Sequence, residues 1–257
     1  MPRKAMPGGS DMTAGTDGSA SWPQIAGWYD QLLRRGSGPH QLAVATTLRL
    51  AGDVRGASVL DLACGQGIAT RALARAGATE VTGVDVTAEM IEAAWRHESA
   101  EPLGIRYLID DAQSLTALRA GSFDIVTCQL GLMDIPDMTL ALTAAARVLR
   151  PGGSLVFVIG HPCFLAPEAT TAQGDDGRPG RLIVEYLTDR FWRSASPGGV
   201  RRAGNYHRTL STYLNTLLAC GYALTAVDEP AAGDLLAADQ PVYSAVPIFF
   251  AARAVRR

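Results

Sequence analysis

The chain has 257 residues, of which 47% are hydrophobic and 19% are charged, an ordinary composition for a globular protein. The 23 basic and 25 acidic residues leave a formal net charge of −2, which argues against electrostatic binding of nucleic acid. This length allows one large domain of about 200–250 residues with a full hydrophobic core.

Residues 1–21 are rich in Gly, Ser and Thr and predict a disordered tail, followed by one domain over residues 22–257. A secretory leader and a hydrophobic run long enough to span a membrane are both missing, so we expect a cytoplasmic protein without membrane contact. The four cysteines occur singly and without zinc-ligand spacing, which predicts buried thiols and no metal site: Cys64, Cys128, Cys163 and Cys220.

Helical spacing of hydrophobic residues predicts a helix over residues 22–35 and a shorter one over 40–51. From residue 57 the pattern alternates between strands and helices. Strands are expected over residues 57–61, 80–84, 105–109, 123–128 and 154–159. Helices are expected up to residue 76, over 87–98 and over 139–149. Strands joined by helical crossovers favour a parallel sheet covered on both faces.

The alternation stops after the fifth strand. Residues 162–205 form a long segment with two Gly/Pro-rich stretches, which predicts an inserted lid, and the run 181–192 within it is strand-like. A helix over residues 207–220 and strands over 223–228 and 243–252 complete the pattern. The predicted fold class is therefore α/β, with a seven-stranded, mostly parallel sheet, N-terminal helices and a lid after strand five.

The segment VLDLACGQG, residues 59–67, ends the first strand and opens a helix. Gly65 and Gly67 allow the backbone to approach a ligand closely, and the free N–H groups of the following helix point at it. Asp85 ends the second strand, where a carboxylate can accept hydrogen bonds from two ribose hydroxyls. A dinucleotide fingerprint needs a third glycine where Thr70 stands, so the pattern favours a nucleoside ligand over a nicotinamide cofactor.

Four further segments follow VLDLACGQG in order: GVDVT (83–87), DDAQSL (110–115), FDIVTCQLGLMDIPD (123–137) and RVLRPGGSLVFV (147–158). Together the five resemble the class I S-adenosylmethionine-dependent methyltransferases, small-molecule branch. The resemblance implies a Rossmann-like fold, S-adenosylmethionine as cofactor, and methyl transfer to O or N of a small, aromatic metabolite. It further suggests a tailoring step in secondary metabolism, such as antibiotic biosynthesis.

The resemblance also assigns roles to residues. The Gly65–Gly67 turn would lie against the methionyl part of the cofactor, with Asp61 ordering the turn and Asp85 holding the ribose. Ala63 stands where the family usually has the first glycine. The other residues implied at the cofactor are Tyr29, Val86, Asp111, Ala112, Gln129 and Leu130.

A general base is needed only if the acceptor is weakly acidic, and two histidines are candidates. His161 follows the fifth strand and His207 follows the insertion, so either imidazole could titrate near neutral pH beside the site, or simply pack or cap locally. His40 and His97 are expected at the surface. Asp134 and Asp137 are expected to cap the next helix, with binding of an amine as the less favoured alternative. Candidate acceptor contacts are the aromatic residues Trp28, Tyr186, Trp192 and Tyr206.

Two alternatives bear on the function. A nucleic-acid methyltransferase would carry an Asn/Asp-Pro-Pro-aromatic turn after strand four, where this chain has QLGL (129–132), so that alternative is discounted. A protein that binds S-adenosylmethionine without transferring methyl, as a regulator or a rearrangement scaffold, stays open. The expected partner is a small-molecule acceptor, with no nucleic acid and no membrane, and a homodimer also stays open.

Overall fold

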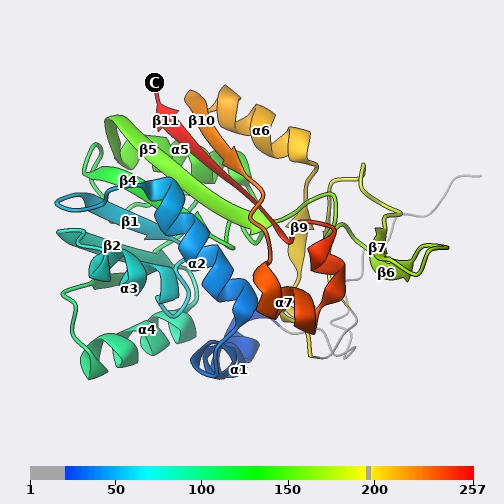
Figure 1. Cartoon of the computed structure of the whole chain (residues 1–257). Coiled ribbons are helices and arrows are strands. Elements are labelled where there is room, and N and C mark those ends of the chain that lie inside the picture. The colour runs from blue at the N-terminus through cyan, green and yellow to red at the C-terminus, as the bar shows by residue number, and fades with distance from the viewer. Residues whose placement is uncertain (1–20, 195–197) are drawn as a thin grey trace, which may run out of the picture.

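The computed structural model describes residues 21–194 and 198–257, so all of the predicted tail except Ser21 lies outside it. A seven-stranded sheet forms its centre, in the order β10-β11-β5-β4-β1-β2-β3 (Figure 1). The strands from β3 to β5 pair in parallel, whereas β11 runs antiparallel to both β5 and β10. The bounds are β1 (Ser58–Leu62), β2 (Glu80–Asp85), β3 (Arg106–Ile109), β4 (Phe123–Gln129), β5 (Leu149–Gly160), β10 (Tyr222–Asp228) and β11 (Phe249–Arg256). The predicted seven-stranded, mostly parallel sheet is confirmed.

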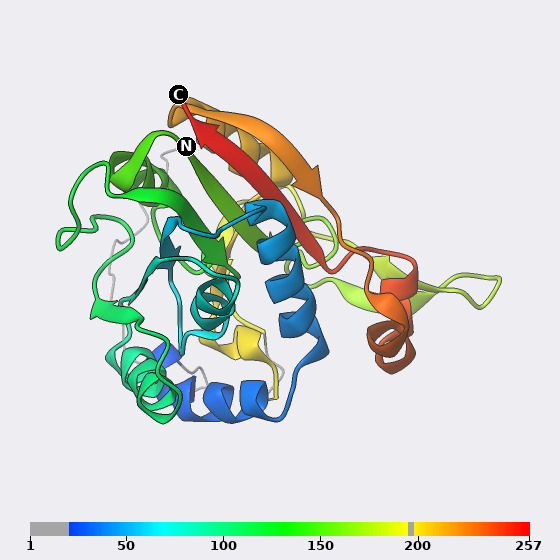
Figure 2. The ribbon, with the colours of Figure 1, turned by 60° about the vertical axis from the view of Figure 1, so that its left-hand side comes forward.

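Helices cover both faces of the sheet (Figures 1 and 2). One face carries α2 (Gly38–Ala51), α3 (Ile68–Arg75) and α4 (Ala88–Ala100), and the other carries α5 (Met138–Val148) and α6 (Leu210–Ala219). All five residues of β1 are buried, because a strand covered on both faces has no solvent side. The main core lies between the sheet, α5 and α6, and a second core lies between the sheet and α2.

Helix α1 (Trp22–Arg34) packs against α4 rather than against the sheet. Its start is stabilised by the side chain of Gln24, whose Oε1 accepts from the Ser21 N–H at 2.7 Å. Asp30 of α1 and His97 of α4 are joined by a hydrogen bond of 2.7 Å between Oδ1 and Nε2, which links the two helices. This helix lies across the edge of the domain where several strands end.

The segment between β5 and α6 folds into two small antiparallel pairs. One is β6 (Thr170–Gln173) with β7 (Pro179–Leu182), a hairpin that projects away from the sheet in both ribbon views. The other is β8 (Arg190–Trp192) with β9 (Asn205–His207), reached through the 3₁₀ helix η1 (Val200–Ala203). The continuous strand-like run expected over 181–192 is wrong, because its two ends pair with different partners and the residues between them form no strand.

Two other boundaries differ from the sequence pattern. The last strand begins at Phe249, where pairing with β5 begins. Of the residues expected before that point, Tyr243 and Ser244 end the 3₁₀ helix η2 (Pro241–Ser244), which follows α7 (Gly233–Asp239), and residues 245–248 form no strand. Strand β5 begins earlier than expected, at Leu149, and a register shift against β4 accommodates Pro151–Gly153.

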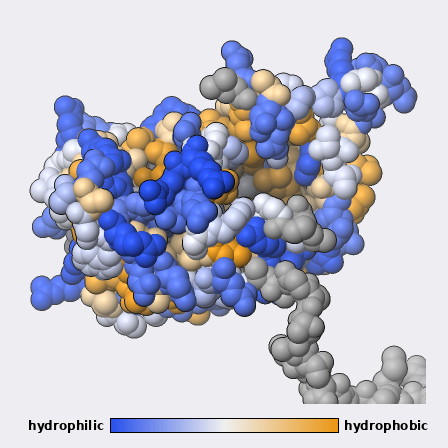
Figure 3. Space-filling model, turned by 90° about the horizontal axis from the view of Figure 1, so that it is seen from below, coloured by the Kyte–Doolittle hydropathy of each residue, from blue (hydrophilic) through white to orange (hydrophobic). Residues whose placement is uncertain are grey.

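Within the described ranges, no helix is both long enough and apolar enough to cross a membrane. The face seen from below is mostly hydrophilic, with hydrophobic residues gathered around a hollow (Figure 3).

Candidate functional site

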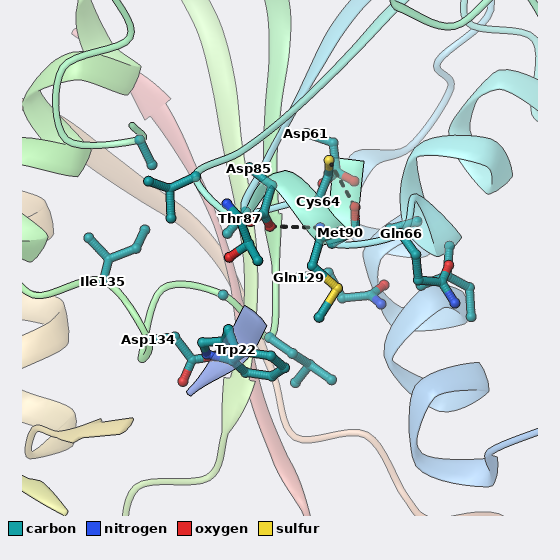
Figure 4. A pocket seen from close by; sticks show the side chains of 18 of the residues that line it. Trp22, Asp61, Cys64, Gln66, Asp85, Thr87, Met90, Gln129, Asp134 and Ile135 are labelled. Carbon is teal, nitrogen blue, oxygen red and sulfur yellow. Dashed lines mark hydrogen bonds between the residues drawn. The ribbon is translucent and has the colours of Figure 1, made fainter. Parts of the chain in front are cut away.

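A cavity of about 270 Å³ opens where β1, β2 and β4 end, beneath α1 (Figure 4). Carboxyl ends of neighbouring parallel strands meet at one edge of a sheet, which is why segments far apart in sequence line one space. The cavity brings together every residue that the resemblance assigned to the cofactor except Gly67: Tyr29, Asp61, Ala63, Gly65, Asp85, Val86, Asp111, Ala112, Gln129 and Leu130.

The turn between β1 and α3 has a left-handed backbone at Ala63, Gly65 and Gly67, with φ of 49°, 56° and 90°. A Cβ on Gly65 would meet no atom within 4 Å, so this glycine leaves open space toward the cavity. A Cβ on Gly67 would fall 2.3 Å from the Tyr107 hydroxyl oxygen. Gly67 is therefore required by backbone conformation and by packing against β3, whereas Gly65 leaves room for a ligand.

Asp61 connects this turn to the sheet. Its carboxylate accepts hydrogen bonds from Thr70 Oγ1 at 2.6 Å and Thr127 Oγ1 at 2.7 Å, which joins the end of β1 to α3 and β4. Burial raises the pKa of Asp61 to about 6, although both hydroxyl hydrogen bonds oppose the shift. Asp61 thus orders the turn while lying in the wall of the cavity.

Asp85 presents its carboxylate at the end of β2. Oδ2 accepts from the Gly65 N–H at 2.9 Å and Oδ1 accepts from the Thr87 N–H at 2.8 Å, while burial raises the pKa of the carboxyl. The adjacent Val86 is 69% exposed despite being aliphatic, and it lines the cavity. An oriented carboxylate beside an exposed aliphatic side chain suits a ribose and the face of an adenine.

The neighbouring part of the wall follows β3, the strand that pairs with β2. Both oxygens of Asp111 lie 3.1 Å from Gln113 Nε2, and Oδ1 also accepts the Gln113 N–H at 2.9 Å. Gln113 in turn accepts the Asp137 N–H at 2.9 Å. This chain of hydrogen bonds fixes an acidic acceptor at the edge of the cavity, where an adenine amino group would meet it. The residues present therefore fit a nucleoside cofactor.

The loop after β4 supplies the remaining wall, on the side of the cavity away from Asp61 and Asp85 (Figure 4). Asp134 in this loop has a side chain only 14% exposed, and its Oδ1 lies 3.3 Å from Arg201 Nη1. Burial raises the pKa of Asp134 from its usual 3.8 to about 7. Asp137 caps α5 as expected, accepting the Leu140 N–H at 2.9 Å, but Asp134 does not cap it.

Sequence reasoning favoured a helix cap for Asp134 over a role in the site. The available signal was an acidic residue inside the otherwise hydrophobic segment LMDIP (132–136). A lone carboxylate in such a segment needs either a partner or a function. Here it has both an arginine partner and a position in the cavity wall.

Neither candidate histidine lines the cavity. His161 is 2% exposed, its Nε2 lies 2.7 Å from Glu229 Oε1, and its ring packs against Phe250. His207 is also buried, and its Nε2 donates to the Tyr186 backbone oxygen at 2.7 Å. Both imidazoles point into packing contacts of the insertion and the last strand.

The four candidate acceptor residues also lie outside the cavity lining. The Arg202 guanidinium carbon lies 3.9 Å from the centroid of the Trp28 ring, and the Tyr206 ring packs against Phe191. The Tyr186 hydroxyl accepts the Leu210 N–H at 2.9 Å, and Trp192 pairs in register with Asn205. These aromatic residues hold the insertion together and attach it to α1.

Tyr29 does line the cavity, and its hydroxyl lies 2.8 Å from His40 Nε2. His40 Nδ1 lies 2.7 Å from Ser37 Oγ. The expectation that His40 is a surface residue is wrong, since only 8% of it is exposed. Burial, together with the charge of Arg201, lowers the pKa of His40 to about 4, so its ring is neutral at neutral pH.

Comparison with known proteins points to one family. Residues 60–157 match the family model described as "Methyltransferase domain". The ubiquinone biosynthesis O-methyltransferase of Xanthomonas oryzae pv. oryzae is 40% identical over 103 residues, 40% of this chain and 43% of that protein. Its namesake from Actinobacillus pleuropneumoniae is 40% identical over 111 residues, 42% of this chain and 47% of that protein. The chain thus spans less than half the length of these curated relatives.

Solved structures match over more of the chain. An S-adenosylmethionine-dependent methyltransferase from Mesorhizobium loti has a TM-score of 0.70 and 28% identity, covering 86% of this chain and 99% of that one. A methyltransferase from Aquifex aeolicus, at 16% identity and a TM-score of 0.58 over 89% of this chain and 98% of that one, shares the fold. The cofactor of these proteins is S-adenosylmethionine, which the residues of the cavity fit. Residues 60–157 therefore match a methyltransferase domain, and the chain is similar to class I S-adenosylmethionine-dependent methyltransferases.

Proposed function

We propose that the protein transfers a methyl group from S-adenosylmethionine to an oxygen of a small, aromatic acceptor. The observation that carries this proposal is Asp134, a nearly buried carboxyl in the wall of the same cavity that presents Asp85. The names of the O-methyltransferase relatives support oxygen as the acceptor atom. Trp22, Ile135 and Pro136 in the cavity wall suit an apolar ring.

One group of cavity residues would bind the cofactor, and Asp134 with its neighbours would face the acceptor. Asp85 would hold the ribose, Val86 and Asp111 the adenine, and the open space at Gly65 would take the methionyl part. When bound, S-adenosylmethionine supplies an already activated methyl group. The protein therefore has to orient the acceptor, exclude water and remove the acceptor's proton.

Asp134 is the proposed general base. A hydroxyl that gains a methyl group must lose its proton, and a base works best when its pKa lies near the working pH. Burial brings the pKa of Asp134 to about 7, which meets this condition. We propose Asp134 in place of either histidine, because His161 and His207 are held by partners outside the cavity lining.

The test incubates the protein with S-adenosylmethionine and a panel of phenols, alcohols, amines and carboxylic acids. Mass spectrometry detects S-adenosylhomocysteine and any methylated product. We expect turnover with a hydroxylated aromatic acceptor, and a loss of about 10²–10⁴-fold in Asp134→Asn with binding of S-adenosylhomocysteine retained. Turnover with amines alone would overturn the choice of oxygen. Binding without turnover across the panel would favour a protein that does not transfer methyl.

A further inference from the structure

The insertion contacts the loop that carries Asp134. Arg201 of η1 contacts this loop, with Nη1 3.3 Å from Asp134 Oδ1 and Nη2 3.1 Å from Met133 Sδ. Its side chain is 22% exposed and is not part of the cavity lining. An ion pair this sheltered is screened less by water and salt than a surface pair.

Neighbouring contacts hold Arg201 in this position. The next residue, Arg202, stacks on Trp28 of α1, and the Tyr206 N–H donates to the Met133 oxygen at 2.7 Å. Helix η1 of the insertion thus packs against α1. One short segment thus contacts both the helix that covers the cavity and the loop that carries the carboxyl.

The loop backbone is secured separately. The buried Arg208 guanidinium donates to the carbonyl oxygens of Ile135 and Pro136, both at 2.7 Å, and of Leu132 at 3.3 Å. These bonds hold the main chain but leave the Asp134 carboxylate free. Among the described residues, Arg201 forms the ion pair with that carboxylate.

We propose that Arg201 is a positioning residue for Asp134. Arg201 keeps the Asp134 carboxylate ionised and oriented, so the insertion contributes to the function of the base. This inference rests on the proposed function, since it assumes that Asp134 accepts the acceptor's proton. It gives the insertion a chemical role in addition to any role in enclosing the acceptor.

The charges around Asp134 predict the consequence of removing Arg201. Arg201 and Arg208 lower the pKa of Asp134, whereas burial and Asp85 raise it. Tyr29 and Tyr213 face the same region as neutral phenols, because burial raises the pKa of each. Without Arg201 the pKa of Asp134 should rise further, so that a higher pH is needed to ionise the base.

The test compares Arg201→Met and Arg201→Lys with Arg178→Met, which removes the same charge from an exposed arginine of the insertion, 86% of whose side chain is accessible. In each variant the pH dependence of kcat is measured by S-adenosylhomocysteine formation. The acidic limb of this profile is the fall of kcat at low pH, where the base becomes protonated. We expect Arg201→Met to move this limb to a pH about one unit higher or more, with kcat recovering at high pH. Arg201→Lys should leave the limb near its wild-type position, and Arg178→Met should leave it unchanged.

A second readout does not depend on turnover. The free energy of unfolding is measured across the same pH range in each variant, and the range over which Asp134 titrates should move upward in Arg201→Met. A uniform drop in kcat with an unmoved limb, or an equal shift in Arg178→Met, would overturn the role of Arg201. If Asp134→Asn keeps the wild-type limb, the proposed function fails instead. If the acidic limb of the pH profile changes in Asp134→Asn but not in Arg201→Met, only the inference about Arg201 is refuted.

Discussion

Asp134→Asn should make the folded protein more stable at high pH while removing the proposed base. The Asp134 carboxyl has a pKa of about 7 in the folded protein, against 3.8 as its usual value. A group whose folded pKa is raised holds its proton more tightly in the folded state. Its contribution to stability is therefore greatest at low pH and is lost as the pH rises through the folded pKa.

The size of the effect follows from this difference. A shift of about 3 pKa units corresponds to about 4 kcal/mol, since one unit is about 1.4 kcal/mol. Part of this penalty is already present at about pH 5, above the unfolded pKa. Because 14% of the side chain is exposed, the full value is an upper limit. We expect the stability advantage of Asp134→Asn to grow by about 2–3 kcal/mol between about pH 5 and pH 8.

The assay is urea unfolding followed by circular dichroism at both pH values, for wild type and variant. Asp53→Asn is the matched control, because hydrogen bonding by Arg55 lowers the pKa of Asp53 to about 2 and this exposed group does not titrate in the range. A difference between wild type and Asp134→Asn that stays constant with pH would refute the reasoning.

Three further predictions concern the cofactor side and the framework. Asp85→Ala should weaken binding of S-adenosylhomocysteine by about 1.5–3 kcal/mol in calorimetric titration, and an unchanged affinity would contradict the ribose assignment. Gly67→Ala should lower Tm well beyond Gly56→Ala, because both have positive φ but only Gly67 is crowded. Arg71→Met should lower the free energy of unfolding by about 3–5 kcal/mol, since it leaves the buried Glu98 carboxylate without its 2.8 Å partner. A loss of about 1 kcal/mol or less, as for an exposed ion pair, would show that the pair is dispensable.

Much of the fold could be predicted because it depends on local periodicity. Hydrophobic strands separated by helical segments can bury their side chains only in a covered parallel sheet. That arrangement already implies that the ends of neighbouring strands meet, so Asp61, Asp85 and Gln129 could be expected at one cavity from their places in the chain. The glycines of the first turn were similarly visible, as residues that permit left-handed backbone.

The predictions that failed depended on distant partners. The run 181–192 has strand-forming residues, yet its ends pair with β6 and β9, which no local pattern specifies. His40 resembles a surface helical residue until Tyr29 and Ser37 enclose it. The position of His161 after a strand end likewise does not predict its contact with Glu229, which is 68 residues away in the chain.

The sequence by itself determined the layered α/β sheet, the cavity at its strand ends and the character of the nucleoside half of the site. The tertiary structure alone decided which residues form the proposed acceptor half. Periodicity and strand position govern which backbone positions converge, but the protonation and direction of a side chain depend on its burial and on charges brought from elsewhere in the chain. Asp134 becomes a candidate base because the fold buries it and places Arg201 against it.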